Sequence, residues 1–73
     1  MTLDGLPLNK KAVIIKVLGE GSLRRRLLDM GLTPKTEVSV VRKAPSGDPL
    51  VLFFRGYELS IRKKDARKIL LDE

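Results

Sequence analysis

Apolar and polar residues along this chain follow a pattern that is typical of short β-strands. The segment "AVIIKVL" is rich in β-branched residues and has only one polar member, so we expect a strand that is buried on much of both faces. The later segments "TEVSVVRK" and "YELSIR" alternate apolar and polar residues, as strands with one buried face do. The predicted strands are residues 12–18, 36–43, 50–55, 57–62 and 69–71.

The last two alternating strands also predict which side chains lie inside. Tyr57, Leu59 and Ile61 share one face, which we assign to the core. Phe53 and Phe54 lie in the apolar run "LVLFFR", so we expect both to pack in the core as well. Arg55 and the glycine after it form a tight-turn signal between these two strands.

One helix is predicted over residues 23–30. Ser22 precedes it as a good N-cap, and Gly31 follows it as a good C′ residue. Leu32 then supplies the hydrophobic contact back to Leu27 that commonly accompanies such a helix end. The chain cannot continue the helix much further, because a proline follows at position 34.

The run "RRR" at the start of this helix does not form one patch in space. At about 100° per residue, Arg24, Arg25 and Arg26 point in three directions. Arg25 and Asp29 are spaced to form a weak pair one turn apart. Leu28 falls beside the main apolar stripe, so it either packs against the rim of the core or stands exposed as an anchor.

These elements predict a mainly β protein of one domain over residues 1–73. Its architecture is a small five-stranded β-barrel with one helix inserted between the first and second strands. The segment "APSGDP" at residues 44–49 is a hairpin loop, a usual place for binding residues on a small barrel. Asp65 is placed to cap a short helical turn before the last strand.

The composition excludes several kinds of chemistry but does not by itself identify the function. The chain has a formal net charge of +6 and no Cys or His, so the usual zinc ligands and the commonest catalytic bases are absent. Its carboxylates are dispersed, and we predict neither an enzyme nor an intrinsic metal or cofactor site. No segment has the long apolar run of a signal peptide or a bilayer span, so we expect a cytoplasmic protein.

The positive charge is compatible with several functions. Gly19 and Gly21 follow a strand and open a helix, but the further residues of a phosphate-binding loop do not follow them. A basic helix could instead supply an arginine to a partner GTPase, although no single arginine is singled out. A nucleic-acid-binding barrel would use a basic stripe. That stripe would consist of Arg42, Lys43, Arg62, Lys63 and Lys64.

The chain resembles the ferrous iron transport protein A (FeoA) family. The segments that carry the resemblance are "RRRLLDMGLTP", "EVSVVRKAPSGDPL" and "FRGYELSIRKKDARKI", and it extends from Ala12 to Leu71. It implies an SH3-like barrel, a role as an accessory protein of ferrous-iron uptake, and the membrane permease FeoB as partner. It also implies transition-metal binding at the level of the family. The same module occurs as the C-terminal domain of metal-dependent repressors, whose DNA-binding domain this chain lacks.

The chain departs from the family in the turn after the helix. The family commonly has Pro-Gly there, whereas this sequence has Pro34 and Lys35. A type II turn needs a positive φ at the second of these positions, so either the turn is of type I or Lys35 is strained.

We predict that the helix and the 44–49 loop dock on the cytoplasmic face of the permease, with the hairpin turn as a further contact. We expect no nucleic-acid partner, no insertion into the membrane, and a monomer or a weak oligomer. The predicted partner-binding residues are Arg24, Arg25, Leu28, Met30, Pro45, Asp48, Arg55 and Tyr57.

Overall fold

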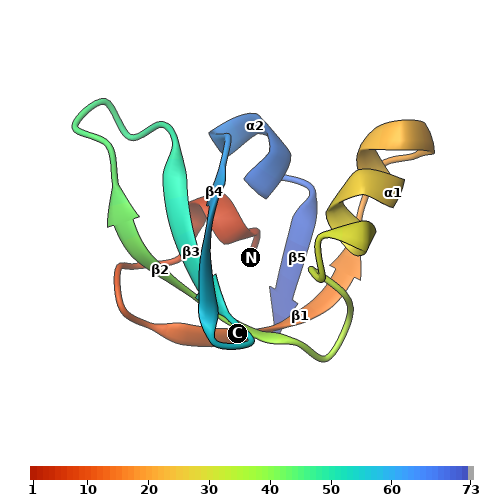
Figure 1. Cartoon of the computed structure of the whole chain (residues 1–73), viewed down its shortest axis with the longest axis horizontal. Helices are drawn as coiled ribbons and strands as arrows, with labels where there is room; N and C mark the ends of the chain where they lie inside the picture. The colour runs from red at the N-terminus through yellow and green to blue at the C-terminus, as the bar shows by residue number, and fades with distance from the viewer. Residues whose placement is uncertain (73) are drawn as a thin grey trace.

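A computed structural model of the chain describes residues 1–72 and contains one antiparallel sheet of five strands (Figure 1). The class and the five strands are as predicted, and so is the helix between the first two strands. The elements are η1 (Leu3–Gly5), β1 (Lys11–Val17), α1 (Gly21–Asp29), β2 (Glu37–Lys43), β3 (Leu50–Phe54), β4 (Tyr57–Ile61), α2 (Lys63–Ala66) and β5 (Ile69–Asp72). The 3-10 turn η1 has no counterpart in the sequence prediction.

The sheet runs in the order β4-β3-β2-β1-β5 and curls around the core. β4 and β5 are its two ends, and α2 with η1 lies across the side where they approach (Figure 1). α1 stands at the other end of the molecule from the loop between β2 and β3. The fully buried side chains of the core are Leu3, Leu6, Ile14, Val17, Leu27, Leu32, Val38, Val40, Leu50, Leu52, Phe54, Ala66, Ile69 and Leu71.

Three predictions about the strands are wrong. Tyr57, which we assigned to the core face of β4, is 46% exposed because it lies at the end of the sheet. The other two concern residues on the outer face of the sheet. β1 is buried on one face only, because within residues 1–72 no other element covers the outer side of the sheet there: Val13 is 37% exposed and Ile15 is 48% exposed. In β3 the alternation places Leu50, Leu52 and Phe54 inward. It therefore turns Phe53 outward with 43% of its surface exposed, against our expectation that both phenylalanines are core residues.

α1 begins earlier than predicted and ends as predicted. Its N-cap is Glu20 without a side-chain cap, so Ser22 is not the cap but lies within the first turn. At the other end Gly31 has φ +99° and donates its N–H to the carbonyl of Leu28 at 3.0 Å. The N–H of Leu32 donates to the carbonyl of Leu27 at 3.2 Å, which completes a Schellman motif with both leucines buried.

The turn after α1 is the type II turn with strain at its third position, Lys35, rather than a type I turn. Lys35 has φ +74°, and the N–H of Thr36 donates to the carbonyl of Thr33 at 3.2 Å, as in a type II turn. The predicted tight turn between β3 and β4 is also present, with positive φ at both Arg55 and Gly56.

α2 is capped differently from our prediction. Asp65 lies inside the helix and is only 7% exposed, because it faces α1 and pairs with Arg26 at 3.5 Å. The carboxylate of Asp48, from the loop between β2 and β3, accepts the N–H of Lys63 at 2.9 Å. The helix start is therefore satisfied by a residue distant in the sequence.

Candidate docking surface

An open groove of about 680 Å³ runs along the exposed side of α1. We call it the α1 groove, and it contains three of the predicted partner-binding residues, Arg24, Arg25 and Leu28. The residues that line it are Gly21, Ser22, Arg24, Arg25, Leu28 and Asp29. Two cations thus stand beside an apolar side chain, which suits an acidic residue next to an apolar one on a partner.

The two arginines of the α1 groove differ in freedom. The Nε of Arg24 donates to the carbonyl of Val17 at 3.2 Å, which ties its side chain to the end of β1. Arg25 forms no ion pair with Asp29 within residues 1–72, so the weak pair expected from their spacing is not made. Arg25 therefore keeps its full charge available for a partner.

Leu28 combines both roles that the sequence left open. It is half-buried and packs against the core, and its remaining surface lines the α1 groove. Met30, at the C-cap of α1, is also half-buried against the core. An apolar group fixed in this way can be covered by a partner without first losing much side-chain freedom.

Arg55 and Tyr57 fasten the end of α1 to the hairpin. The Nη2 of Arg55 donates to the hydroxyls of Thr33 at 3.0 Å and Thr36 at 2.8 Å, and its Nε donates to the carbonyl of Gly31 at 3.3 Å. The hydroxyl of Tyr57 donates to the carbonyl of Met30 at 2.9 Å. Both residues remain exposed, so a partner could still contact them, but each has a structural role that the sequence did not reveal.

The structure does not bring the 44–49 loop to the α1 groove. α1 and this loop lie at opposite ends of the longest dimension, which is 30 Å (Figure 1). Pro45 is exposed at the loop, whereas the carboxylate of Asp48 is used to start α2. One partner would have to extend along the whole molecule to contact both regions.

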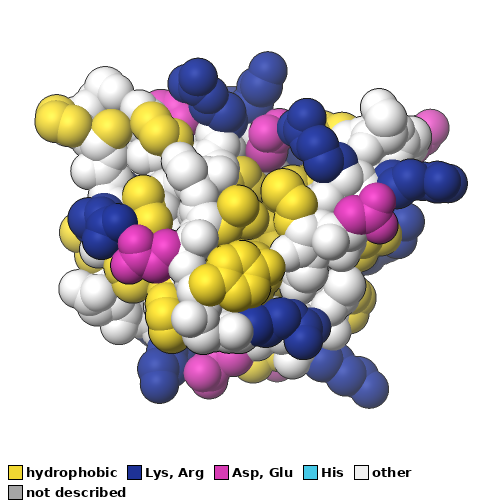
Figure 2. All heavy atoms as spheres, viewed as in Figure 1, with side chains coloured by type: hydrophobic (Ala, Val, Ile, Leu, Met, Phe, Trp, Pro, Cys, Tyr) yellow, Lys and Arg dark blue, Asp and Glu magenta, His cyan; other side chains and the backbone are white. Residues whose placement is uncertain are grey.

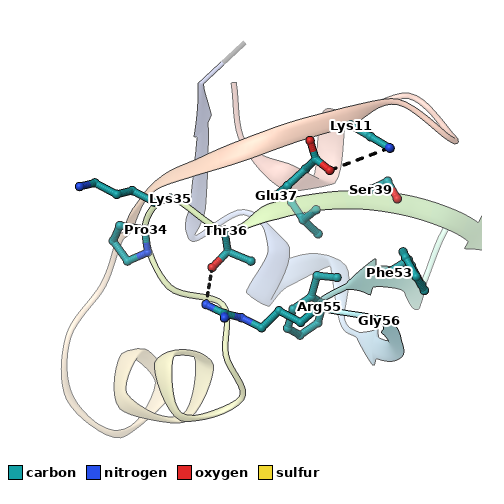
Figure 3. A pocket seen from close by; sticks show the side chains of 11 residues that line it. Lys11, Pro34, Lys35, Thr36, Glu37, Ser39, Phe53, Arg55 and Gly56 are labelled. Atoms are coloured by element: carbon teal, nitrogen blue, oxygen red, sulfur yellow. Dashed lines mark hydrogen bonds and ion pairs between the residues drawn. The ribbon is translucent and has the colours of Figure 1, made fainter.

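A second groove, of about 520 Å³, lies on the outer face of the sheet and was missed from the sequence (Figure 3). Phe53 lies on one side of it with Arg55, whose guanidinium points toward Thr36, and Lys11 approaches Glu37 at 4.0 Å on the other. Strict alternation along β3 would have found Phe53. The lining residues come from three separate segments, at residue 11, residues 34–39 and residues 53–56, which only the fold brings together.

The described residues do not fit a transition-metal site. The sequence has no Cys or His, and within residues 1–72 no three carboxylates are grouped so that they could share an ion. No helix in the same residues is long and apolar enough to cross a bilayer.

A comparison with models of known protein families identifies the family of this chain. The model of the FeoA domain matches residues 1–73. The chain belongs to the FeoA family. Members of the family are named as proteins of ferrous-iron transport, and the family is not a known enzyme family.

Solved structures of FeoA proteins have the same fold. The FeoA-like protein from Clostridium acetobutylicum is 39% identical, with a TM-score of 0.91 over 99% of this chain and 84% of that one. FeoA from Stenotrophomonas maltophilia, described as a prokaryotic SH3 domain protein complexed with zinc, is 32% identical. Its TM-score is 0.87 over 99% of this chain and 89% of its own, so the SH3-like architecture is as predicted.

Two further proteins extend the comparison. A fusion of Fe(2+) transport protein A with the Fe(2+) transporter FeoB, from Porphyromonas gingivalis, is 39% identical over 69 residues. The match covers 94% of this chain and only 8% of the fusion protein. A manganese-dependent transcriptional repressor shares the fold alone, with a TM-score of 0.89 at 9% identity over 99% of this chain and 35% of that one.

Proposed function

We propose that this FeoA-family chain is a non-enzymatic accessory protein of ferrous-iron uptake that docks on the cytoplasmic part of a FeoB-type permease. Its place would then be the cytoplasm, and it would act as a monomer or a weak oligomer. The fused relative from Porphyromonas gingivalis supports the association, because it joins the two proteins in one chain. On this chain, we propose that the α1 groove is the surface that contacts the permease.

The α1 groove is suited to a partner surface that pairs a carboxylate with an apolar side chain. Leu28 gives a fixed apolar contact, and Arg25 gives an exposed cation without an ion-pair partner in residues 1–72. Arg24 adds a second positive charge held in place by the carbonyl of Val17. Charges of this kind at an interface mainly direct association and select the partner.

The experiment that tests this proposal is a calorimetric titration of the permease's cytoplasmic region with this protein. Arg25→Glu should weaken binding about 10-fold or more, because it places a negative charge opposite an acidic surface. Lys35→Glu is the matched control: it makes the same change of charge outside the α1 groove and should change the affinity less than about threefold.

The outcome that contradicts docking through α1 is an equal effect of both variants, or none. An NMR titration of the same pair would then locate the contact. Shifts confined to Pro45 and Asp48 would move the interface to the loop at the other end of the molecule. Shifts at Met30, Arg55 and Tyr57 together with α1 would extend it toward the hairpin.

A further inference from the structure

The segment that forms α2 has an exposed surface made almost entirely of cations. Residues 62–68 contain five basic residues and one acidic residue. All five basic residues are exposed, whereas Asp65 is turned inward against α1. We call the five the α2 patch: Arg62, Lys63, Lys64, Arg67 and Lys68.

Most of the charge in the α2 patch is not balanced. Arg67 lies 3.6 Å from Asp4, but the other four cations have no carboxylate within ion-pair distance in residues 1–72. The carboxylate of Asp48 also contacts this segment, but it accepts the backbone N–H of Lys63 and forms no ion pair with a side chain of the α2 patch. Four of the five cations of the α2 patch therefore have no ion-pair partner within residues 1–72.

The outer face of the sheet differs, because two of its cations are paired with carboxylates on other strands. Arg42 of β2 lies 2.6 Å from Glu58 of β4, and Lys11 of β1 lies 4.0 Å from Glu37 of β2. Figure 2 shows dark blue side chains projecting along the upper edge of the molecule, where Figure 1 places α2. The α2 patch thus groups four cations without an ion pair in residues 1–72 within seven consecutive positions, whereas others, such as Arg25 and Lys35, lie apart from it.

We propose that the α2 patch binds the anionic headgroups of a membrane surface. A cluster of four or more exposed lysines and arginines is attracted to acidic lipids within about one Debye length of the bilayer. Lysine suits this role because its flexible stem lets the ammonium group reach lipid phosphates while the domain itself stays outside the bilayer.

The inference depends on the proposed function in one respect: docking on a membrane permease brings the α2 patch close to a bilayer. The ion pair between Arg26 and Asp65 joins α1 to α2, so the α1 groove and the α2 patch are held in a fixed relation. A chain docked on a membrane transporter through α1 would then have a second, rigidly oriented surface for the lipid beside it. Contact with both would hold the domain more firmly than either contact alone.

The absence of aromatic side chains from the α2 patch favours lipid over nucleic acid as its partner. Single-stranded nucleic acid is usually bound by exposed aromatic rings beside the cations. The aromatic residues here are Phe53, Phe54 and Tyr57, and none belongs to the α2 patch.

The test is flotation of the whole protein with vesicles, in the absence of any permease, so its failure would leave the docking proposal standing. We expect no flotation with phosphatidylcholine vesicles and clear flotation when phosphatidylglycerol is added, declining at high salt. Lys63→Gln with Lys64→Gln should reduce partition about 30-fold, since each lysine near an acidic bilayer contributes roughly a fivefold factor. The control, Lys11→Gln with Lys35→Gln, removes the same charge outside the α2 patch and should change partition less than about threefold.

Two results would overturn the inference. Equal losses in the two double variants would show that total charge, and not the α2 patch, determines binding. Absence of flotation with acidic vesicles, together with binding of RNA or DNA that Lys63→Gln and Lys64→Gln abolish, would assign the α2 patch to nucleic acid instead. Circular dichroism of each variant confirms that the comparison is made between folded proteins.

Discussion

At the scale of single residues, Lys35 occupies a backbone conformation that glycine adopts more easily. Its φ of +74° lies in the left-handed region, where a Cβ atom is crowded by the backbone. The N–H of Lys35 donates to the carbonyl of Ile14 at 2.7 Å, so the turn is tied to β1 and cannot relax to another form without losing that bond. The strain is therefore maintained by the surrounding sheet.

Replacing Lys35 by glycine should stabilise the protein. We expect Lys35→Gly to raise the free energy of unfolding by about 1 kcal/mol, because the relief of strain exceeds the added entropy of the unfolded chain. Urea denaturation measures this, and Lys43→Gly within β2 is the control that should lower it by about 0.5–1 kcal/mol. A loss of stability in Lys35→Gly would mean that the lysine stem contributes packing that outweighs the strain.

At the scale of elements, the end of α1 is the most constrained junction of the fold. Gly31 closes the Schellman motif with φ +99°, and its carbonyl accepts from the Nε of Arg55. A Cβ added at this position would lie 3.2 Å from Cε2 of the buried Phe54. The ring of Phe54 cannot move freely, because Tyr57 packs against it with ring centroids 4.8 Å apart.

Gly31→Ala should destabilise the protein by about 1–3 kcal/mol, since it combines an unfavourable φ with a crowded contact in the core. Gly5→Ala is the matched control: a Cβ there meets nothing within 4 Å and φ does not lie in the left-handed region. We expect its effect to be within about 0.5 kcal/mol. Thermal unfolding of the two variants gives the comparison, and similar melting temperatures would contradict the assigned role of Gly31.

At the scale of the whole molecule, α1 contributes one fully buried side chain to the core, while Leu23, Leu28 and Met30 pack against the edge of the core. Leu27 is its only fully buried residue, whereas Leu28 is half-buried at the edge of the core. A domain of this size has a total stability of only about 4–11 kcal/mol, so one core residue represents a large share of it. The docking groove therefore depends on the same helix face that completes the core.

Leu27→Ala should cost about 3 kcal/mol, because the cavity it leaves lies between α1 and the sheet. Leu28→Ala removes the same atoms from a half-exposed site and should cost about 1 kcal/mol. Urea denaturation separates the two. Leu28→Ala then remains folded for the docking titration, where it should weaken binding to the permease if Leu28 is the apolar contact; unchanged affinity would remove it from the interface.

The sequence by itself determined the order of the five strands, the place of α1 between the first two, and the end of α1. Alternation, β-branched runs and the glycine after α1 are local signals, and each reports a local backbone preference. The same signals would have placed Phe53 outside, had the alternation along β3 been given more weight than the apolar run.

Only the tertiary structure decided which charges are balanced and which surfaces lie together. The sequence predicts Asp65 as a helix cap, yet the packing of α2 against α1 turns it toward Arg26. The sequence predicts Arg55 as a turn residue and a partner contact, and the curl of the sheet also brings its guanidinium to the turn after α1. Such outcomes depend on contacts between residues far apart in the chain, and local propensity carries no information about them.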